Sequence, residues 1–226
     1  MSVAYIFNSH EPVNQQIYRK LRQEIVCCQI APGALLSEKE ISLRFTVSRQ
    51  PVREAFIKLA EAGLVQILPQ RGTFVKKISA ERVADARFIR EAVELAVVRQ
   101  AAKTCHAEHL FHLEDNLLQQ RRAALHNDRL EFLRLDDAFH QQIAESTGNQ
   151  LAWETIENIK ATMDRVRFLT LDEVTPPGIL IEQHQIIFNA LKDQDSHAAE
   201  QGMRDHLRQL VFSIEPITAQ NLSWFE

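Results

Sequence analysis

Four side chains able to bind a metal ion fall on the inward faces of three expected helices. Asp136 and His140 are four residues apart, so they stack on one face of their helix. His184 and His206 each take a core position in an apolar stripe of another helix. A buried polar side chain is costly without a partner. We therefore expect either separately hydrogen-bonded core residues or one shared site for Zn²⁺, Ni²⁺ or Mn²⁺, with coordination positions left for a carboxylate ligand.

A second set of side chains has the chemistry of DNA binding. Arg49, Gln50 and Arg53 share one side of a short expected helix near its N-terminus, opposite its apolar residues. The planar fork of an arginine can bind O6 and N7 of guanine together, which lysine cannot do. Arg71 and Gly72 follow in a turn, where the glycine allows a tight bend close to phosphate.

Short helices and a hairpin must position these basic residues. Ser37 begins a helix with a capping box, Ser48 is a favourable N-cap for the next helix, and Gly63 suits the left-handed position that ends it. Two short helices joined by a tight turn, then a basic hairpin, predict a winged helix-turn-helix. The expected elements are helices over 13–28, 37–45 and 48–62 and strands over 64–67 and 73–75.

Charge supports this division of the chain. The net charge is −4, but residues 1–78 hold 11 Lys and Arg against 6 Asp and Glu, whereas the remainder holds 15 against 24. A basic first third on an acidic body indicates that the first part meets a polyanion. The alternative is a three-helix interaction module with a solvated basic face, which leaves the arginines of the helix and of the hairpin without a role.

The N-terminal motifs resemble the winged helix of the GntR family of bacterial transcription regulators. The resemblance implies that Lys39, Arg49, Arg53, Arg71 and Gly72 contact double-stranded operator DNA. Lys39 stands where many members have arginine, which favours a phosphate contact there. Ser48 and Gln50 complete the candidate DNA-binding set. The matching segments are Leu36-Ser37-Glu38-Lys39-Glu40-Ile41, Val47-Ser48-Arg49-Gln50-Pro51-Val52-Arg53-Glu54-Ala55 and Pro69-Gln70-Arg71-Gly72-Thr73-Phe74-Val75.

From Ser79 onward the sequence predicts helices without strands. Breaks at Asn127-Asp128, Gly148-Asn149 and Thr175-Pro176-Pro177-Gly178 separate them, and helices without strands form a bundle. We expect a mostly α fold with a winged helix-turn-helix domain over 1–78 and an all-helical domain over 79–220. The expected helices run over 80–104, 107–126, 129–146, 149–171, 178–192 and 195–215.

This second part resembles the FCD (FadR C-terminal) domain of the FadR subfamily, in its metal-binding subset. The resemblance rests on Asp136-Asp137-Ala138-Phe139-His140, Glu182-Gln183-His184 and Asp205-His206-Leu207. It implies a divalent ion bound by Asp136, His140, His184 and His206, with a small organic acid as effector. Arg90 is the candidate for the effector carboxylate, and an ion pair with Glu94 one turn later is the competing explanation.

These expectations combine into a metabolite-responsive repressor that binds a palindromic operator as a homodimer, because one recognition helix reads too few bases. A metal-dependent enzyme with a DNA-binding appendage is the alternative, but no nucleophile motif, phosphate loop or paired catalytic carboxylates accompany the metal ligands. Three cysteines, no signal-peptide pattern and no apolar run long enough to cross a bilayer indicate a cytoplasmic protein without a membrane partner.

Overall fold

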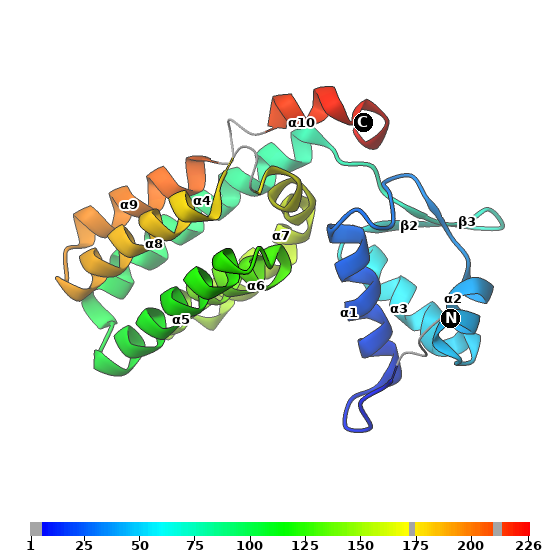
Figure 1. Cartoon of the computed structure of the whole chain (residues 1–226), viewed down its shortest axis with the longest axis horizontal. Helices are drawn as coiled ribbons and strands as arrows, with labels where there is room; N and C mark the ends of the chain where they lie inside the picture. The colour runs from blue at the N-terminus through cyan, green and yellow to red at the C-terminus, as the bar shows by residue number, and fades with distance from the viewer. Residues whose placement is uncertain (1–5, 172–174, 210–213) are drawn as a thin grey trace. The chain divides into compact units, whose positions relative to one another are not determined.

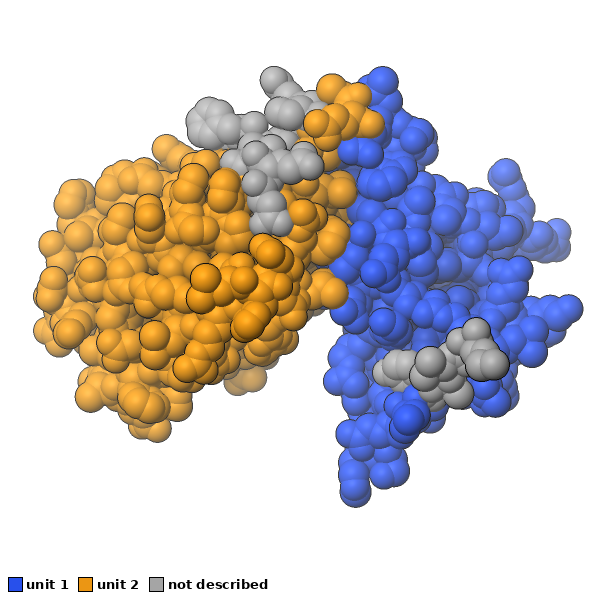
Figure 2. All heavy atoms as spheres, in the orientation of Figure 1, with its two compact units in different colours: residues 1–80, 221–226 blue, residues 81–220 orange. Residues whose placement is uncertain are grey.

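The computed structural model describes residues 6–171, 175–209 and 214–226. The chain forms two compact units (Figure 2). Unit 1 comprises Met1–Ala80 together with Asn221–Glu226, and unit 2 comprises Glu81–Gln220. The mostly α fold expected from the sequence is confirmed, with a small sheet in unit 1 and helices throughout the described part of unit 2 (Figure 1).

Unit 1 is built on three helices, α1 (Val13–Val26), α2 (Glu38–Phe45) and α3 (Arg49–Glu61). Helix α3 packs on α1, and α2 packs on α3 as well. Apolar residues spaced for a helical stripe form the core between them, and all of these are almost fully buried: Ile17, Leu21, Ile25, Phe45, Val52, Phe56 and Leu59.

The helix boundaries follow from local chemistry. The Ser37 hydroxyl accepts a hydrogen bond from the Glu40 N–H at 3.3 Å, which satisfies one free donor at the start of α2. Ser48 takes the N-cap position of α3, but its side chain makes no capping hydrogen bond and stays exposed. Gly63 has φ +73°, the left-handed conformation expected after a helix.

The wing is a three-stranded antiparallel sheet in the order β1-β3-β2. The two expected strands are β2 (Val65–Leu68) and β3 (Gly72–Val75), and β3 also pairs with β1 (Leu35–Leu36). The sequence did not predict β1, because two residues carry no alternating pattern. Gly72 has φ +109°, and a Cβ there would lie 2.8 Å from Leu35 Cδ1, so the turn needs glycine.

The last residues of the chain belong to unit 1. A 3₁₀ helix, η2 (Leu222–Trp224), leads to Phe225, which is 8% exposed. The Ile78 N–H donates to the Trp224 carbonyl at 2.8 Å, and the Glu226 N–H donates to the Ile78 carbonyl at 3.1 Å. The structure thus places this tail, for which the sequence made no prediction, beside the end of the wing.

Unit 2 matches the predicted helices closely, apart from the last. The last predicted helix runs over 195–215, whereas the observed helix ends at Arg208 and a separate helix, α10, begins at Ile214. Residues 210–213 of the prediction lie outside the described residues. In the described residues no helix is long and apolar enough to cross a membrane. The helices are α4 (Ala80–Thr104), α5 (Ala107–Leu125), α6 (Arg129–Glu145), α7 (Gln150–Thr170), α8 (Pro177–Lys192), α9 (Ser196–Arg208) and α10 (Ile214–Gln220).

Two clusters of buried apolar residues fill the part of unit 2 that the structure describes. The larger joins all the helices from α4 to α9, and it includes Val98, Leu113, Leu117, Phe139, Ile187 and Met203. The smaller joins α5, α6 and α8, and it includes Ala123, Phe132, Leu135 and Leu180. The residues expected to do chemistry in this unit project from the same helices.

Candidate metal centre and nucleic-acid surface

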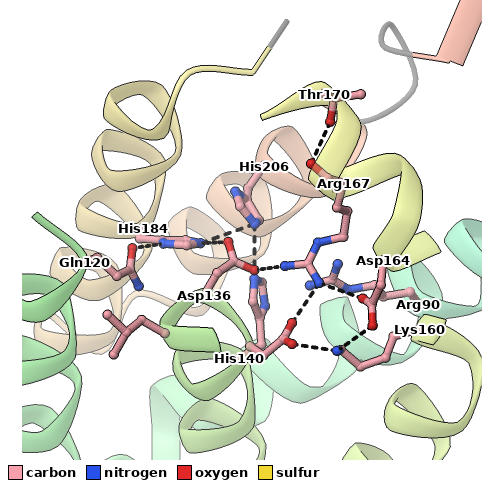
Figure 3. A network of polar contacts seen from close by, with 12 residues as sticks. Arg90, Gln120, Asp136, His140, Lys160, Asp164, Arg167, Thr170, His184 and His206 are labelled. Atoms are coloured by element: carbon pink, nitrogen blue, oxygen red, sulfur yellow. Dashed lines mark hydrogen bonds and ion pairs between the residues drawn. The ribbon is translucent and has the colours of Figure 1, made fainter. Parts of the chain in front are cut away.

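The structure brings the four expected metal-binding side chains together in the interior of unit 2. Asp136 and His140 project from α6, His184 from α8 and His206 from α9 (Figure 3). All four are buried, and each offers one ligand atom within 4.8 Å of the others. Helical spacing predicts that each residue faces inward from an apolar-stripe position of its own helix, and the structure adds that the four meet.

The Nε2 atoms of the three imidazoles point toward one another. His206 Nε2 lies 3.1 Å from His140 Nε2 and 3.3 Å from His184 Nε2. The Asp136 Oδ1 atom lies 3.5 Å from His184 Nε2. Whether these contacts are favourable depends on which ring nitrogen carries the proton.

A chain of amides fixes the protonation of His184. The Asn116 side-chain amide donates to the Leu135 backbone carbonyl at 3.0 Å, so its oxygen is left to accept from Gln120 at 2.7 Å. That bond turns the Gln120 oxygen toward His184 Nδ1, at 2.9 Å. Since an amide oxygen can only accept, Nδ1 carries the proton, and the His184 Nε2 atom presents a lone pair.

The other two rings are held in the same way. His140 Nδ1 donates to the Glu94 carboxylate, and His206 Nδ1 contacts the Gln183 side-chain oxygen at 3.0 Å. The Nε2 atoms of His184 and His206 therefore turn lone pairs toward each other, beside the Nε2 atom of His140. A cation at their centre relieves this arrangement, and the set of three imidazole nitrogens and one carboxylate suits a divalent transition metal.

The protonation states of these groups favour ligand chemistry. Burial lowers the pKa of His184 to about 3 despite the opposing effect of Asp136. Burial, together with the neighbouring His184 and His140, also lowers the pKa of His206 well below its usual value. Burial opposes the ionisation of Asp136, but Arg167, His184 and His140 together outweigh it and lower the pKa of the carboxyl. The site therefore holds the neutral imidazoles of His184 and His206 beside a carboxylate, the forms that bind metals.

A network of charges on α7 holds the carboxylates of α6. Arg167 donates to Asp136, and also to Asp137 at 2.7 Å and to Asp164 at 3.2 Å (Figure 3). Lys160 pairs with Asp137 at 2.5 Å. The structure thus directs Asp137 toward the basic side chains of α7, whereas Asp136 lies between Arg167 and the imidazole of His184.

A small cavity of about 50 Å³ adjoins the imidazoles. Its lining includes Asp136, His206 and three arginines, Arg87, Arg90 and Arg167. The expected effector residue therefore does line a cavity beside the imidazole cluster.

The competing explanation for Arg90 is present as well. The Arg90 Nε atom lies 2.5 Å from Glu94 Oε1, in the ion pair expected one helical turn apart. Burial opposes ionisation of Glu94, but Arg90 and His140 together lower its pKa to about 2. Glu94 thus joins the arginine of the cavity to an imidazole of the cluster, a link that the sequence could not reveal.

The residues that support the cluster escaped sequence reasoning. Gln120, Gln183 and Arg167 are polar residues on separate helices, and polar residues are ordinary on helix surfaces. Gln120 gave one signal that could have been used: it lies in line with Leu113 and Leu117 on the buried side of α5, where a polar residue needs a partner.

The expected DNA-binding residues lie on the surface of unit 1. Lys39 on α2 and Arg49, Gln50 and Arg53 on α3 are all exposed. Arg53 is already engaged, because its Nε and Nη2 atoms donate to the two carboxylate oxygens of Glu38 at 3.1 and 3.0 Å. This ion pair fixes the direction of Arg53, and sequence reasoning did not anticipate it. Gln50 donates to the carboxylate of Glu54, at 2.9 Å.

At the wing, Arg71 and Gly72 lie at the exposed turn between β2 and β3. The Arg71 N–H donates to the Leu68 carbonyl at 3.1 Å, which closes the turn. The Arg71 side chain is exposed.

Both parts of the chain match known families. Residues 13–75 match the bacterial regulatory proteins of the gntR family, and residues 85–209 match the FCD domain. The transcriptional repressor RspR of Escherichia coli is 52% identical over 100% of this chain and 99% of its own length. The sequence of residues 13–78 already resembles that of this repressor. A transcriptional regulator of Streptomyces ambofaciens is 42% identical over 93% of this chain and 89% of its length.

Solved structures agree on the fold. The E. coli protein McbR/YncC superposes with a TM-score of 0.78 at 20% identity and covers 94% of this chain and 99% of its own. A GntR regulator from Rhodococcus superposes with a TM-score of 0.71 at 26% identity and covers 94% of this chain and 99% of its own. The matched families and relatives are transcription regulators, so the expectation of a regulator rather than an enzyme is confirmed. The chain belongs to the GntR family of bacterial transcription regulators and carries the FCD domain of the FadR-like members.

Proposed function

We propose that this regulator is a repressor that binds a palindromic operator as a homodimer and responds to a divalent metal and a small carboxylate. The observation that carries the sensor half is the convergence of three Nε2 atoms, on rings that are each held by a hydrogen bond at Nδ1. The repressor half draws on the 52% identity to RspR, which is named a transcriptional repressor.

In unit 1, α3 is the proposed recognition helix. Arg49 is exposed in its first turn, where the side chains of a helix entering the major groove reach base edges. Arg53 lies one turn further, held by Glu38, so its free Nη1 edge is presented in one orientation. Lys39 and Ser48 supply phosphate contacts, and Arg71 and Gly72 carry the wing to the backbone or minor groove.

In unit 2, Asp136, His140, His184 and His206 would hold Zn²⁺, Ni²⁺ or Mn²⁺. A divalent ion supplies open coordination positions for an anionic ligand. Glu94, Gln120 and Gln183 keep the three rings in the tautomer that a metal requires, which raises affinity without any rearrangement.

The cavity beside the cluster gives the effector its proposed place. Arg87, Arg90 and Arg167 contribute three cationic side chains to its lining, and its size of about 50 Å³ suits a small organic acid. An acid bound there competes with Glu94 for Arg90, and Glu94 orients His140. Effector binding would thereby favour one arrangement of the bundle over another and change operator affinity by that difference.

Metal content tests the sensor directly. Untagged protein is incubated with Zn²⁺, Ni²⁺ or Mn²⁺, desalted and analysed by mass spectrometry, beside His184→Ala and the control His126→Ala, whose imidazole is exposed at the end of α5. We expect about one ion per chain in the wild type and the control, and a clear loss in His184→Ala. Equal occupancy in all three proteins, or none in the wild type, contradicts the metal site.

A further inference from the structure

The outer face of α5 carries large apolar side chains in contact with water. Phe111, Leu118 and Leu125 are 67%, 48% and 81% exposed. They follow one another at intervals of seven residues, so they lie within about 40° of one another around the helix axis. The opposite face, with Leu113, is buried against α6 and α8 (Figure 1). This outer stripe therefore has no partner within the described part of unit 2.

Exposed charges border the stripe in a particular order. Glu114 and Asp115 lie between its first and second apolar residues, and Arg121 and Arg122 lie between its second and third. The N-terminal half of the face is thus acidic and the C-terminal half basic. Such an order is complementary to itself when the helix is reversed.

We propose that α5 packs antiparallel against α5 of a second copy, with Leu118 of both chains at the two-fold axis. The proposal deepens the homodimer of the proposed function by naming its surface. The two-fold axis pairs each residue of one copy with the residue of the second copy that lies equally far along the helix on the other side of Leu118. Phe111 of each copy therefore lies near Leu125 of the second copy. The apolar stripe then leaves water along about 21 Å of helix.

The same axis decides which charges meet. Glu114 and Arg121 lie on one side of the stripe, and Asp115 and Arg122 lie on the other, so each acid faces the arginine on its own side in the second copy. The two-fold axis doubles both pairs. Within its own chain Arg121 donates to Gln185 at 2.8 Å, which holds it at the edge of the face. The opposite arrangement, two parallel helices, places like charges together and is disfavoured.

The surface continues onto α8. Ile186 is 57% exposed and, with Gln185 and Arg121, lines an open groove between α5 and α8. A second copy on α5 would also cover this apolar residue, which enlarges the contact toward the area that a stable dimer needs.

The central leucine gives the first test. The dimer dissociation constant of the full chain is measured by sedimentation, for the wild type, Leu118→Asp and the control Leu151→Asp, which changes a 69% exposed leucine of α7. Leu118→Asp brings two unpaired carboxylates together at the axis and should weaken the dimer roughly a hundredfold or more. The control should leave the dimer unchanged.

Charge reversal gives a second test that loss of folding cannot imitate. Asp115→Arg alone and Arg122→Asp alone each place like charges at two symmetric positions, so each should weaken the dimer about tenfold. The double variant restores opposite charges across the axis and should regain wild-type affinity. Recovery in the double variant supports the antiparallel pairing, and additive weakening overturns it.

The outcomes separate the surface from the dimer itself. Phe88→Asp changes a 72% exposed phenylalanine of α4. If the dimer survives Leu118→Asp but is lost in Phe88→Asp, the α5 surface is overturned, whereas the proposal that the protein is a homodimer stands. A wild-type chain that is monomeric at all concentrations overturns both.

Discussion

The stability of unit 2 should fall as the pH drops from about 7 to 5.5, because two imidazoles are buried in their neutral forms. The pKa of His184 is lowered to about 3 and that of His206 well below its ordinary value of 6.5. A histidine whose folded pKa is depressed contributes stability above the unfolded pKa and loses it as the pH falls below that value. In this range the unfolded chain takes up protons that the folded chain excludes.

The magnitude follows from the linkage relation. For an unfolded pKa of 6.5 and a folded pKa below the range, each histidine costs about 1.3 kcal/mol between pH 7 and pH 5.5. His184 and His206 together therefore remove about 2.5 kcal/mol from the free energy of unfolding. The pKa of Glu94 is lowered to about 2 and its ordinary value is 4.5, so this carboxylate changes its protonation only in more acidic solution.

Urea unfolding of chelator-treated protein measures this effect. The chain has two tryptophans, Trp153 in unit 2 and Trp224 in unit 1, so in a Trp224→Phe background the fluorescence reports on unit 2. The pH-dependent loss should be about 2.5 kcal/mol in that background, half of it in His184→Gln, and near zero when His206→Gln is added. An equal loss in all three proteins would refute the neutral buried imidazoles, whatever the absolute stability of each variant.

Three further predictions concern the proposed DNA surface, the candidate metal site and the wing. Arg53→Ala should cost about 1–3 kcal/mol of operator binding in a titration with labelled DNA, whereas Arg134→Ala in unit 2 should cost none. Gln120→Leu removes the acceptor that fixes one imidazole and should weaken metal binding about 10–100-fold in a competition titration. The control Gln119→Leu changes a half-buried neighbour that bonds Asp115 instead, and it should not weaken metal binding. Gly72 has φ +109°, and a Cβ there would lie only 2.8 Å from Leu35 Cδ1, so Gly72→Ala should destabilise unit 1 by about 1–3 kcal/mol. Thermal unfolding followed by Trp224 fluorescence measures this loss, and an unchanged melting temperature would contradict the strain.

Much of the fold could be predicted because its signals are local. Helical periodicity gave nearly every helix of unit 2 within one or two residues, and caps such as Ser37 gave the helix boundaries of unit 1. The strand β1 (Leu35–Leu36) could not be predicted, because it exists only through its pairing with β3. The tail could not be predicted either, because nothing near Phe225 in sequence indicates a partner at Ile78.

The candidate site shows the same division. Asp136 and His140 stand on one helix four residues apart, so their common direction follows from helix geometry alone. The tautomer of His184 depends on a hydrogen-bond chain through Gln120 and Asn116 to a backbone carbonyl of another helix. Such a chain is set by tertiary packing and leaves no periodic trace in the sequence.

The pairing of Ile78 with residues 224–226 has a consequence for the order in which the protein is made. Unit 1 is discontinuous along the chain, because all of Glu81–Gln220 is synthesised between its two segments. During synthesis on the ribosome, the backbone groups of Ile78 cannot form their hydrogen bonds with residues 224–226 until the whole of unit 2 has emerged. Unit 1 is therefore completed last, after unit 2 has had time to fold, and a nascent chain lacks its finished DNA-binding unit until unit 2 is present.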